Sequence, residues 1–376
     1  MRLLRTLVLS ATLVSSAAAQ GTLSTQGFGY PAGGLSTRAE GLGGSITEND
    51  PLSPLNPATL ATWGRPGLYL QYDPEFRRVQ ANGTKDNTLT ARFPIISGAL
   101  NIGPRVTVGI SSTTFLDRTW QTSRTGYAHF ETGDSSLYNE SFSTDGAIND
   151  VRVAGSFLVT PALSIGLAGH VLTGQNRLLI SRTFADTNFS AFSQASTLSY
   201  TGHSFSGGVE WRPVPAVSIG VSGDAGGTMH AYRNDTTLSS ARVPKRFGFG
   251  TVFGGVSGVL LSANAEWNGW SALNGLAESE IKAVDGWDWG VGAEVRAPGL
   301  FGQELPVRLG YRHRILPFEA SEAQVHETDY SLGFGIPVSR GRSRVDLSVT
   351  RANRSASLAD VSEHAWILSA GFFIRP

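Results

Sequence analysis

The sequence has no cysteine, only three lysines among its 376 residues, and a formal net charge of zero. Without cysteine, disulfide bonds, thiolate metal sites and cysteine nucleophiles are excluded. Binding to nucleic acid is not expected either, because proteins that neutralise phosphates carry an excess of basic side chains. The seven histidines show no spacing typical of metal ligands, so we expect no metal site and no cofactor.

Long apolar runs are also missing. Residues 1–19 have the features of a secretory signal peptide: Arg2 and Arg5 are basic, residues 7–14 are mostly apolar, and cleavage is expected after Ala19. In the rest of the chain no apolar stretch approaches the ~18 residues that a membrane-spanning helix requires. Hydropathy does not detect membrane barrels, however, because their strands alternate lipid-facing apolar residues with polar or small residues.

A period of two residues dominates the sequence from residue 67 onward. In residues 330–336, for example, Tyr, Leu, Phe and Ile alternate with Ser and Gly. Such runs predict about fourteen strands, an even number as in bacterial outer-membrane barrels. The expected ranges are 67–80, 86–101, 105–120, 146–159, 162–182, 197–212, 216–232, 244–256, 259–270, 284–297, 305–314, 328–338, 343–353 and 363–375.

The predicted connections alternate between two kinds. Short turns rich in glycine and proline, as at 103–104 and 213–215, alternate with longer polar segments that we expect to be loops, as at 121–145 and 233–243. This alternation is typical of an outer-membrane barrel with periplasmic turns and outer loops. We therefore predict an all-β protein, an antiparallel transmembrane β-barrel formed by residues 67–376, with residues 20–66 as an N-terminal hatch that plugs a wide lumen.

The segment before the first strand carries a resemblance to a known family. A glycine-rich stretch at 41–45 is followed by Asn56-Pro57-Ala58 and then Thr, Leu and Ala. This pattern resembles the start of FadL-type outer-membrane transporters and their PorV-like relatives, and residues 305–337 are similar to the closing hairpins of that superfamily. The resemblance implies a hatch inside the barrel and passage of hydrophobic substrates through a side opening. The alternative for Asn56-Pro57 is an ordinary Asx-Pro turn. The chain is shorter than typical fatty-acid transporters and ends in Arg-Pro after its last aromatic residues.

Strand parity places several charged side chains on the polar face, because charge on the lipid face would cost about 2–4 kcal/mol per residue near the bilayer centre. Arg152, Arg246, Arg308 and Arg312 are the candidates for contacts with a ligand or with the hatch. Two interpretations remain open. The arginines form a salt-bridged lining that holds the hatch, or one of them binds an anionic head group.

The second predicted strand contains a break in its pattern. Its apolar set changes face at Pro94, which cannot donate a hydrogen bond to a strand ladder, and the next strand becomes polar on its outward parity at Ser112. We interpret this region as a candidate lateral opening, with an ordinary bulge as the alternative.

The sequence contains no sign of catalysis. Gly202-His203-Ser204-Phe205-Ser206 lacks the final glycine of a nucleophile elbow and lies in a strand. We expect a monomeric channel in the outer membrane of a Gram-negative-type bacterium, for passive uptake of hydrophobic small molecules such as long-chain fatty acids. Its expected partners are outer-membrane lipid, the hydrophobic ligand and the barrel-assembly machinery. The alternatives are a PorV-like partner or shuttle in protein secretion and surface attachment, and a purely structural barrel.

Overall fold

The computed structural model describes residues 29–81, 84–129, 135–186, 188–276, 282–297, 304–320, 323–338, 342–356 and 361–375. The predicted signal peptide and residues 20–28 lie outside these ranges. Four short helices are present in them: α1 (Thr37–Gly41), η1 (Thr47–Asn49), η2 (Pro57–Thr62) and η3 (Trp270–Leu276). In the described part of the chain, no helix is long and apolar enough to cross a membrane.

The rest of the fold is a single antiparallel sheet of seventeen strand segments. They are β1 (Gly67–Ala81), β2 (Thr84–Arg92), β3 (Ile95–Ile102), β4 (Val106–Asp117), β5 (Trp120–His129), β6 (Ser135–Thr160), β7 (Leu163–Phe184), β8 (Phe192–Val214), β9 (Val217–Arg233), β10 (Thr236–Arg242), β11 (Arg246–Val256), β12 (Val259–Asn268), β13 (Gly286–Ala297), β14 (Leu305–Ala320), β15 (Ala323–Val338), β16 (Ser343–Ala356) and β17 (Val361–Ile374).

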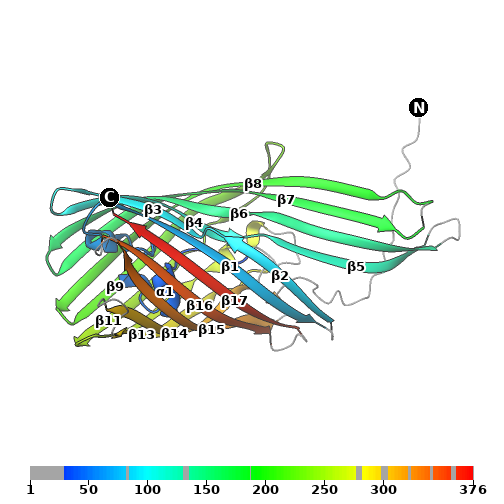
Figure 1. Ribbon diagram of the computed structural model, residues 1–376. Coiled ribbons are helices and arrows are strands. Elements are labelled where there is room, and N and C mark those ends of the chain that lie inside the picture. Colours follow the sequence, from blue (N-terminus) through cyan, green and yellow to red (C-terminus); the bar gives the residue numbers. More distant parts are fainter. Residues whose placement is uncertain are drawn as a thin grey trace.

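The segments make fourteen wall strands, because three strands are interrupted, at 93–94, 118–119 and 243–245. The sheet closes on itself where β1 pairs with β17 from Leu68 opposite Ile374 to Ala81 opposite Val361. The predicted closed antiparallel barrel of fourteen strands is therefore confirmed, and Figure 1 shows β1 and β17 side by side.

The two faces of the wall have the opposite polarity from those of a soluble protein. On β15, Tyr330, Leu332 and Phe334 point outward and are exposed, whereas Glu327 and Asp329 point inward and are buried. The same arrangement recurs around the barrel: many large apolar side chains are exposed on its outside, and many charged and hydroxyl side chains are buried in its interior. An apolar exterior of this kind suits the hydrocarbon layer of a bilayer. Closure of the sheet also pairs most backbone groups, as a membrane-embedded wall requires.

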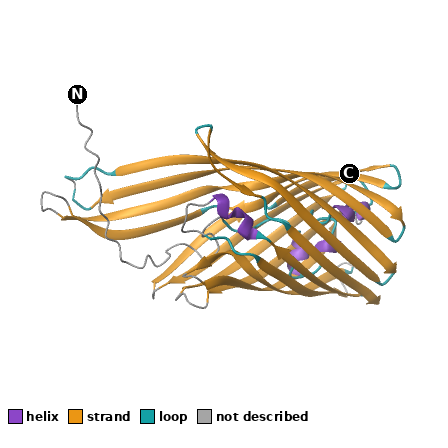
Figure 2. Cartoon of the chain, turned by 180° about the vertical axis from the view of Figure 1, so that it is seen from behind, coloured by secondary structure: helices purple, strands orange, loops and turns teal. Residues whose placement is uncertain are grey.

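Residues 29–66 lie inside the barrel, and we call them the plug. Figure 2 shows the helices of this segment enclosed by the strands. The plug is held close to the wall at glycines: a Cβ on Gly310 would lie 2.1 Å from the nitrogen of Gly43, and one on Gly166 would lie 2.3 Å from the carbonyl carbon of Pro57. Such approaches require residues without a side chain, which explains part of the glycine excess.

The predicted loops at 121–145 and 233–243 are wrong. The first region is the hairpin of β5 and β6, and the second is the end of β9 together with β10. β6 has 26 residues, whereas about 9–11 tilted residues cross a bilayer, so β5 to β8 project far beyond the rest of the barrel (Figure 1). The prediction failed because the sequence of residues 121–145 lacks the apolar alternation from which the other strands were predicted.

Candidate functional site: a plugged lumen with charged and apolar regions

The Asn56-Pro57-Ala58 motif fixes the plug near the end of the barrel that carries the short turns. The Asn56 side chain is buried; its Oδ1 accepts a hydrogen bond from the nitrogen of Ala58 at 3.0 Å and so caps η2, which Pro57 begins. Its Nδ2 donates to the carbonyl oxygens of Glu48 at 2.8 Å and Val209 at 3.3 Å. The motif is thus a local turn that also ties the plug to β8.

Arg152 and Arg246 both reach the plug. Arg246 pairs with Glu48 of the plug and donates to Glu266 on β12 at 2.7 Å. Arg152 pairs with Asp150 at 2.8 Å and donates to the carbonyl oxygen of Pro54. Burial raises the pKa of the Glu48 carboxyl, and its ion pair with Arg246 opposes part of that rise.

Arg308 and Arg312 both lie on β14 but belong to separate ion-pair groups. Arg308 donates to Glu294 and to Asp346, each at 2.7 Å, and Glu294 also pairs with Arg38 of the plug at 3.2 Å. Arg312 donates from Nε to Asp288 at 2.8 Å. All four arginines that the sequence singled out therefore face the lumen and are paired with carboxylates, so none of them is left as an unpaired cation.

A larger charged cluster surrounds Tyr30, the first plug residue with a backbone pairing to the wall. The Tyr30 hydroxyl accepts from Arg354 at 2.9 Å, is bonded by Arg314, and lies 3.1 Å from an oxygen of Glu327. The guanidinium carbons of Arg92, Arg314 and Arg354 lie 4.7–5.3 Å from the centre of its ring, within cation–π range. Burial raises the pKa of the Tyr30 hydroxyl, so it stays protonated.

Further ion pairs extend this cluster along the wall. Glu75 contacts Arg77 at 2.8 Å and Arg354 at 2.7 Å, and Arg92 contacts Asp117 at 2.5 Å. All these side chains are less than a tenth exposed. Sequence reasoning missed the cluster, because Tyr30 stands in a glycine-rich leader with no local sign of its partners, which are up to 324 positions away.

Among the described residues, the apolar cluster with the most buried members lies in the lumen beside η3. Ten buried residues form a cluster on the inner faces of β4 and β6 to β9, covered by η3: Leu116, Ile148, Leu172, Tyr200, Met229, Ala231, Val243, Trp270, Leu273 and Ala283. Phe115, Leu198 and Leu276 pack against it. Smaller apolar clusters lie around Phe318 and around Trp63, and charged and hydroxyl side chains fill much of the remaining interior.

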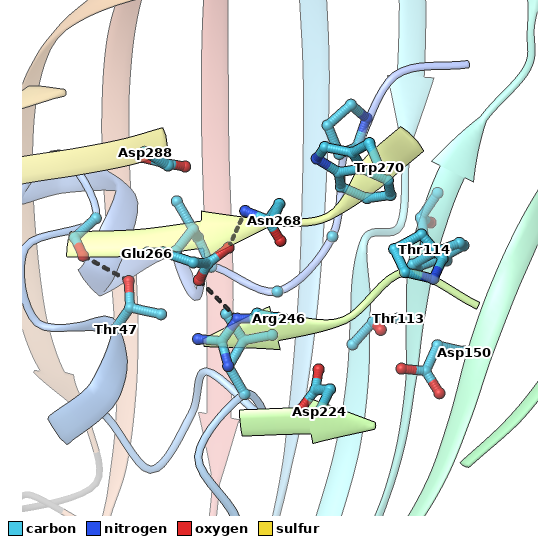
Figure 3. A pocket seen from close by; sticks show the side chains of 18 of the residues that line it. Thr47, Thr113, Thr114, Asp150, Asp224, Arg246, Glu266, Asn268, Trp270 and Asp288 are labelled. Atoms are coloured by element: carbon cyan, nitrogen blue, oxygen red, sulfur yellow. Dashed lines mark hydrogen bonds and ion pairs between the residues drawn. The ribbon is translucent and has the colours of Figure 1, made fainter. Parts of the chain in front are cut away.

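A cavity of about 110 Å³ lies where the apolar cluster meets the charged lining. Leu172, Val243 and Trp270 line one side, and Arg246 and Glu266 line the other. Figure 3 shows the Arg246–Glu266 pair below Asn268, with Trp270 beyond the end of β12, where η3 begins. The cavity also reaches the plug, at Pro31, at residues 33–35 and at Thr47.

The wall changes at Pro94. The ladder between β3 and β4 ends with Ile95 opposite Thr113, and one further bond runs from the nitrogen of Thr114 to the oxygen of Pro94 at 3.1 Å. Beyond this point, within the described residues, β2 pairs only with β1 and β5 pairs only with β6. β2 and β5 thus form no ladder with each other, and we call this interruption the gap; near Pro94 the ion pair of Arg92 with Asp117 joins its two sides. Ser112 lies inside the ladder, opposite Ile96, rather than at the edge of the gap.

Comparison with solved structures identifies the architecture. The chain aligns with a FadL homologue of Pseudomonas aeruginosa at 13% identity and a TM-score of 0.60, covering 93% of this chain and 99% of the other. The Ralstonia pickettii toluene transporter TbuX gives 13% identity, a TM-score of 0.61 and coverage of 92% and 99%.

The chain has the FadL-type fold. The Pseudomonas putida toluene transporter TodX shares it as well, at 13% identity and a TM-score of 0.57, with coverage of 93% and 99%. No family model matches the sequence, and no curated protein matches it. The resemblance predicted from the leader motif is therefore confirmed for the FadL-type barrel as a fold.

Proposed function

We propose that this FadL-type barrel is a monomeric outer-membrane channel for the passive uptake of hydrophobic small molecules. The observation that carries the proposal is the apolar cluster inside the lumen, next to a cavity that borders the plug. Burial of apolar surface stabilises a hydrophobic molecule there relative to water, by about 25 cal/mol per Å². A plain aqueous pore or a purely structural barrel has no use for such a cluster.

The arrangement supports a route from the outer end of the barrel to the apolar cluster and on to the cavity. From there the plug obstructs the direct path along the axis, and the gap between β2 and β5 offers a way through the wall. A molecule that leaves sideways enters the apolar layer of the membrane without crossing water. A cavity of about 110 Å³ is of the order of those that admit benzene, ~150 Å³ in another protein.

The charge distribution favours neutral cargo over fatty acids. Arg152, Arg246, Arg308 and Arg312 each have a carboxylate partner, so an anionic head group would have to displace an existing ion pair. Displacement leaves a buried carboxylate unpaired, which costs several kcal/mol. A neutral hydrocarbon as substrate agrees with the structural neighbours TbuX and TodX, which are toluene transporters.

Uptake by bacterial cells that lack other hydrocarbon channels tests the proposal. Leu172 belongs to the apolar cluster and lines the cavity, so Leu172→Asn should lower the uptake rate of labelled toluene at least fivefold, whereas Leu172→Met, which keeps volume and polarity, should not. Outer-membrane levels of the variants are matched by immunoblot. Equal uptake by Leu172→Asn and the wild type would contradict the proposal, and faster uptake of a long-chain fatty acid than of toluene would contradict the neutral cargo.

The projecting strands β5 to β8 favour a second candidate function, a partner or shuttle for exported proteins. This extension presents strand edges and polar faces well away from the barrel (Figure 1). Purification in mild detergent, followed by mass spectrometry of bound molecules, separates the two functions. Co-purified hydrocarbon or lipid supports uptake, and an empty barrel bound to exported proteins supports the shuttle.

A further inference from the structure

Arg78 points to the lipid side of the wall, toward the end of β1 that lies away from the short turns. The lipid-facing side chains of β1 from Leu68 to Phe76 are mostly apolar and exposed, and Arg78 is the next one after Phe76. Residues 68–76 are nine positions, and about 9–11 tilted residues cross a bilayer. Arg78 therefore lies where the apolar layer meets the head groups. Because the longer connections of outer-membrane barrels face the cell exterior, this boundary belongs to the outer leaflet.

The strands beside β1 form an apolar row just inside this boundary. Phe76 lies opposite Leu89 of β2 and opposite Trp366 of β17, and all three side chains are exposed on the lipid side. Arg351 of β16 lies opposite Trp366 and ends the row. Its guanidinium carbon is 5.2 Å from the centre of the Trp366 ring, within cation–π range. The row is thus apolar along three strands and basic at one end.

A polar row follows, two positions nearer the outer end of the barrel. Arg78 lies opposite Asn87 of β2 and opposite His364 of β17, and its Nε donates to the side-chain oxygen of Asn87 at 3.2 Å. His364 is hydrogen-bonded through Nδ1 to the side chain of Asn353 on β16 at 2.8 Å. The row therefore presents hydrogen-bonding side chains on four adjacent strands, β16, β17, β1 and β2, which Figure 1 shows side by side.

A groove of about 500 Å³ lies over the two rows on the outer surface. Arg78 and Arg351 both line it, and its lining contains no carboxylate. Neither of these arginines has a carboxylate partner within the described chain, in contrast to Arg246 and Arg308 of the lumen. The groove therefore carries positive charge that no described group of the protein neutralises.

We propose that this groove binds the phosphate-bearing head group of an outer-leaflet lipid, a phosphorylated glycolipid. Guanidinium groups bind phosphate through two parallel hydrogen bonds, and they do so more strongly where water is partly excluded. Arg78 and Arg351 are two strands and two positions apart, which corresponds to ~12 Å between their Cα atoms. Their long side chains can therefore contact one head group together.

The apolar row completes the match to a lipid rather than to a free anion. Phe76, Leu89 and Trp366 lie on the membrane side of Arg78, so the acyl chains of a lipid held by its phosphate run along them. Aromatic side chains form girdles at this depth in membrane barrels. The groove thus has a charged region for the head group and an apolar region for the chains, in the order in which a lipid presents them.

Binding of diphosphorylated lipid A to the detergent-purified protein, measured by native mass spectrometry after delipidation, tests the proposal. The variant that combines Arg78→Gln with Arg351→Gln should bind it about tenfold more weakly or worse, because charge-assisted hydrogen bonds to phosphate are lost. The matched control combines Arg65→Gln with Arg296→Gln, two exposed arginines at the short-turn end. Its affinity should stay within about twofold of the wild type, because charges that far away are screened. Equal far-UV circular dichroism confirms that each variant is folded.

Two further probes identify the ligand. Lipid A from which the phosphates have been removed should bind wild type and the Arg78→Gln/Arg351→Gln variant equally weakly, and inorganic phosphate should not displace diphosphorylated lipid A. Equal affinity of wild type and that variant for diphosphorylated lipid A overturns the proposal. Displacement by inorganic phosphate at similar concentration also overturns it, since the groove would then be a site for the free anion. The measurement does not involve transport, so it stands apart from the proposed function.

Discussion

Tyr30→Phe should loosen the start of the plug while leaving the barrel intact. The hydroxyl bonds to three charged groups, Arg354 at 2.9 Å, Glu327 at 3.1 Å and Arg314, whereas the ring keeps its cation–π contacts in the variant. Hydrogen bonds to charged groups contribute about 1.5–3 kcal/mol each, and their losses overlap within one cluster, so we expect a net loss of about 2–3 kcal/mol. At 1.4 kcal/mol per tenfold, that corresponds to about 30-fold to 150-fold more frequent detachment.

Native-state hydrogen exchange in nanodiscs measures this detachment. The amide of residue 30 donates to Asp117 at 2.8 Å and exchanges only when the bridge opens, so its exchange rate reports the opening directly. Tyr69→Phe is the matched control, because the buried Tyr69 hydroxyl bonds to the neutral groups of Thr37 and Gln71. Its loss is worth about 1 kcal/mol, so exchange at residue 30 should rise less than about fivefold. A rate within twofold of the wild type for Tyr30→Phe, or equal effects of both variants, would refute the assignment of the Tyr30 cluster as an anchor.

Three further predictions concern the plug and the gap. Gly208→Ala places a Cβ 2.0 Å from the Asn56 oxygen and should destabilise plug docking by about 1–3 kcal/mol, seen as larger single-channel conductance, whereas Gly155→Ala, with no atom within 4 Å, should leave conductance unchanged. Burial and the nearby Asp73 raise the pKa of Glu40 above its ordinary 4.5, so the docked plug binds more protons than the released plug. Docking should therefore weaken as pH rises from 4.5, and this pH dependence of hydrogen exchange at residue 30 should be smaller in Glu40→Gln than in the wild type. A disulfide between Pro94→Cys and Thr114→Cys should slow toluene uptake several-fold until it is reduced. A disulfide between Leu100→Cys and Val108→Cys, which lie opposite each other further along the β3–β4 ladder, should not slow uptake. Equal uptake rates for the two disulfide variants would exclude an opening at Pro94.

The barrel could be predicted from the sequence because strands in a bilayer need apolar residues at every second position. Each lipid-facing residue must be apolar and each neighbour must face the lumen, so strands such as β15 and β17 show their period of two directly. In the hairpin of β5 and β6 this period is missing from the sequence, and the hairpin was therefore mistaken for a loop. The strands could be predicted where apolar and polar residues alternate, and they were missed where the residues on both faces are polar.

The sequence predicted which charged residues face the lumen, but not which residues they pair with. Parity alone places Arg246 and Arg308 in the lumen, since the cost of charge in lipid decides the side. The partners of these arginines, Glu48 and Asp346, are determined by how the barrel closes and where the plug lies inside it. No local sequence pattern predicts either. The apolar cluster around η3 was also missed, because Trp270 was predicted to end the strand 259–270 and Leu273 lies outside every predicted strand, whereas both belong to η3.

The chemistry of the plug's contacts bears on whether it can move. Ion pairs such as Arg38–Glu294 and Arg246–Glu48 hold it to the wall, together with close backbone approaches at wall glycines such as Gly310. A buried ion pair contributes little net stability relative to the same ions in water, because its Coulomb attraction largely offsets the desolvation of both partners. When water enters the lumen it can replace these contacts pair by pair at modest cost, whereas the lipid-facing apolar wall has no such alternative. A polar plug in a polar lumen can therefore rearrange while the barrel around it stays fixed.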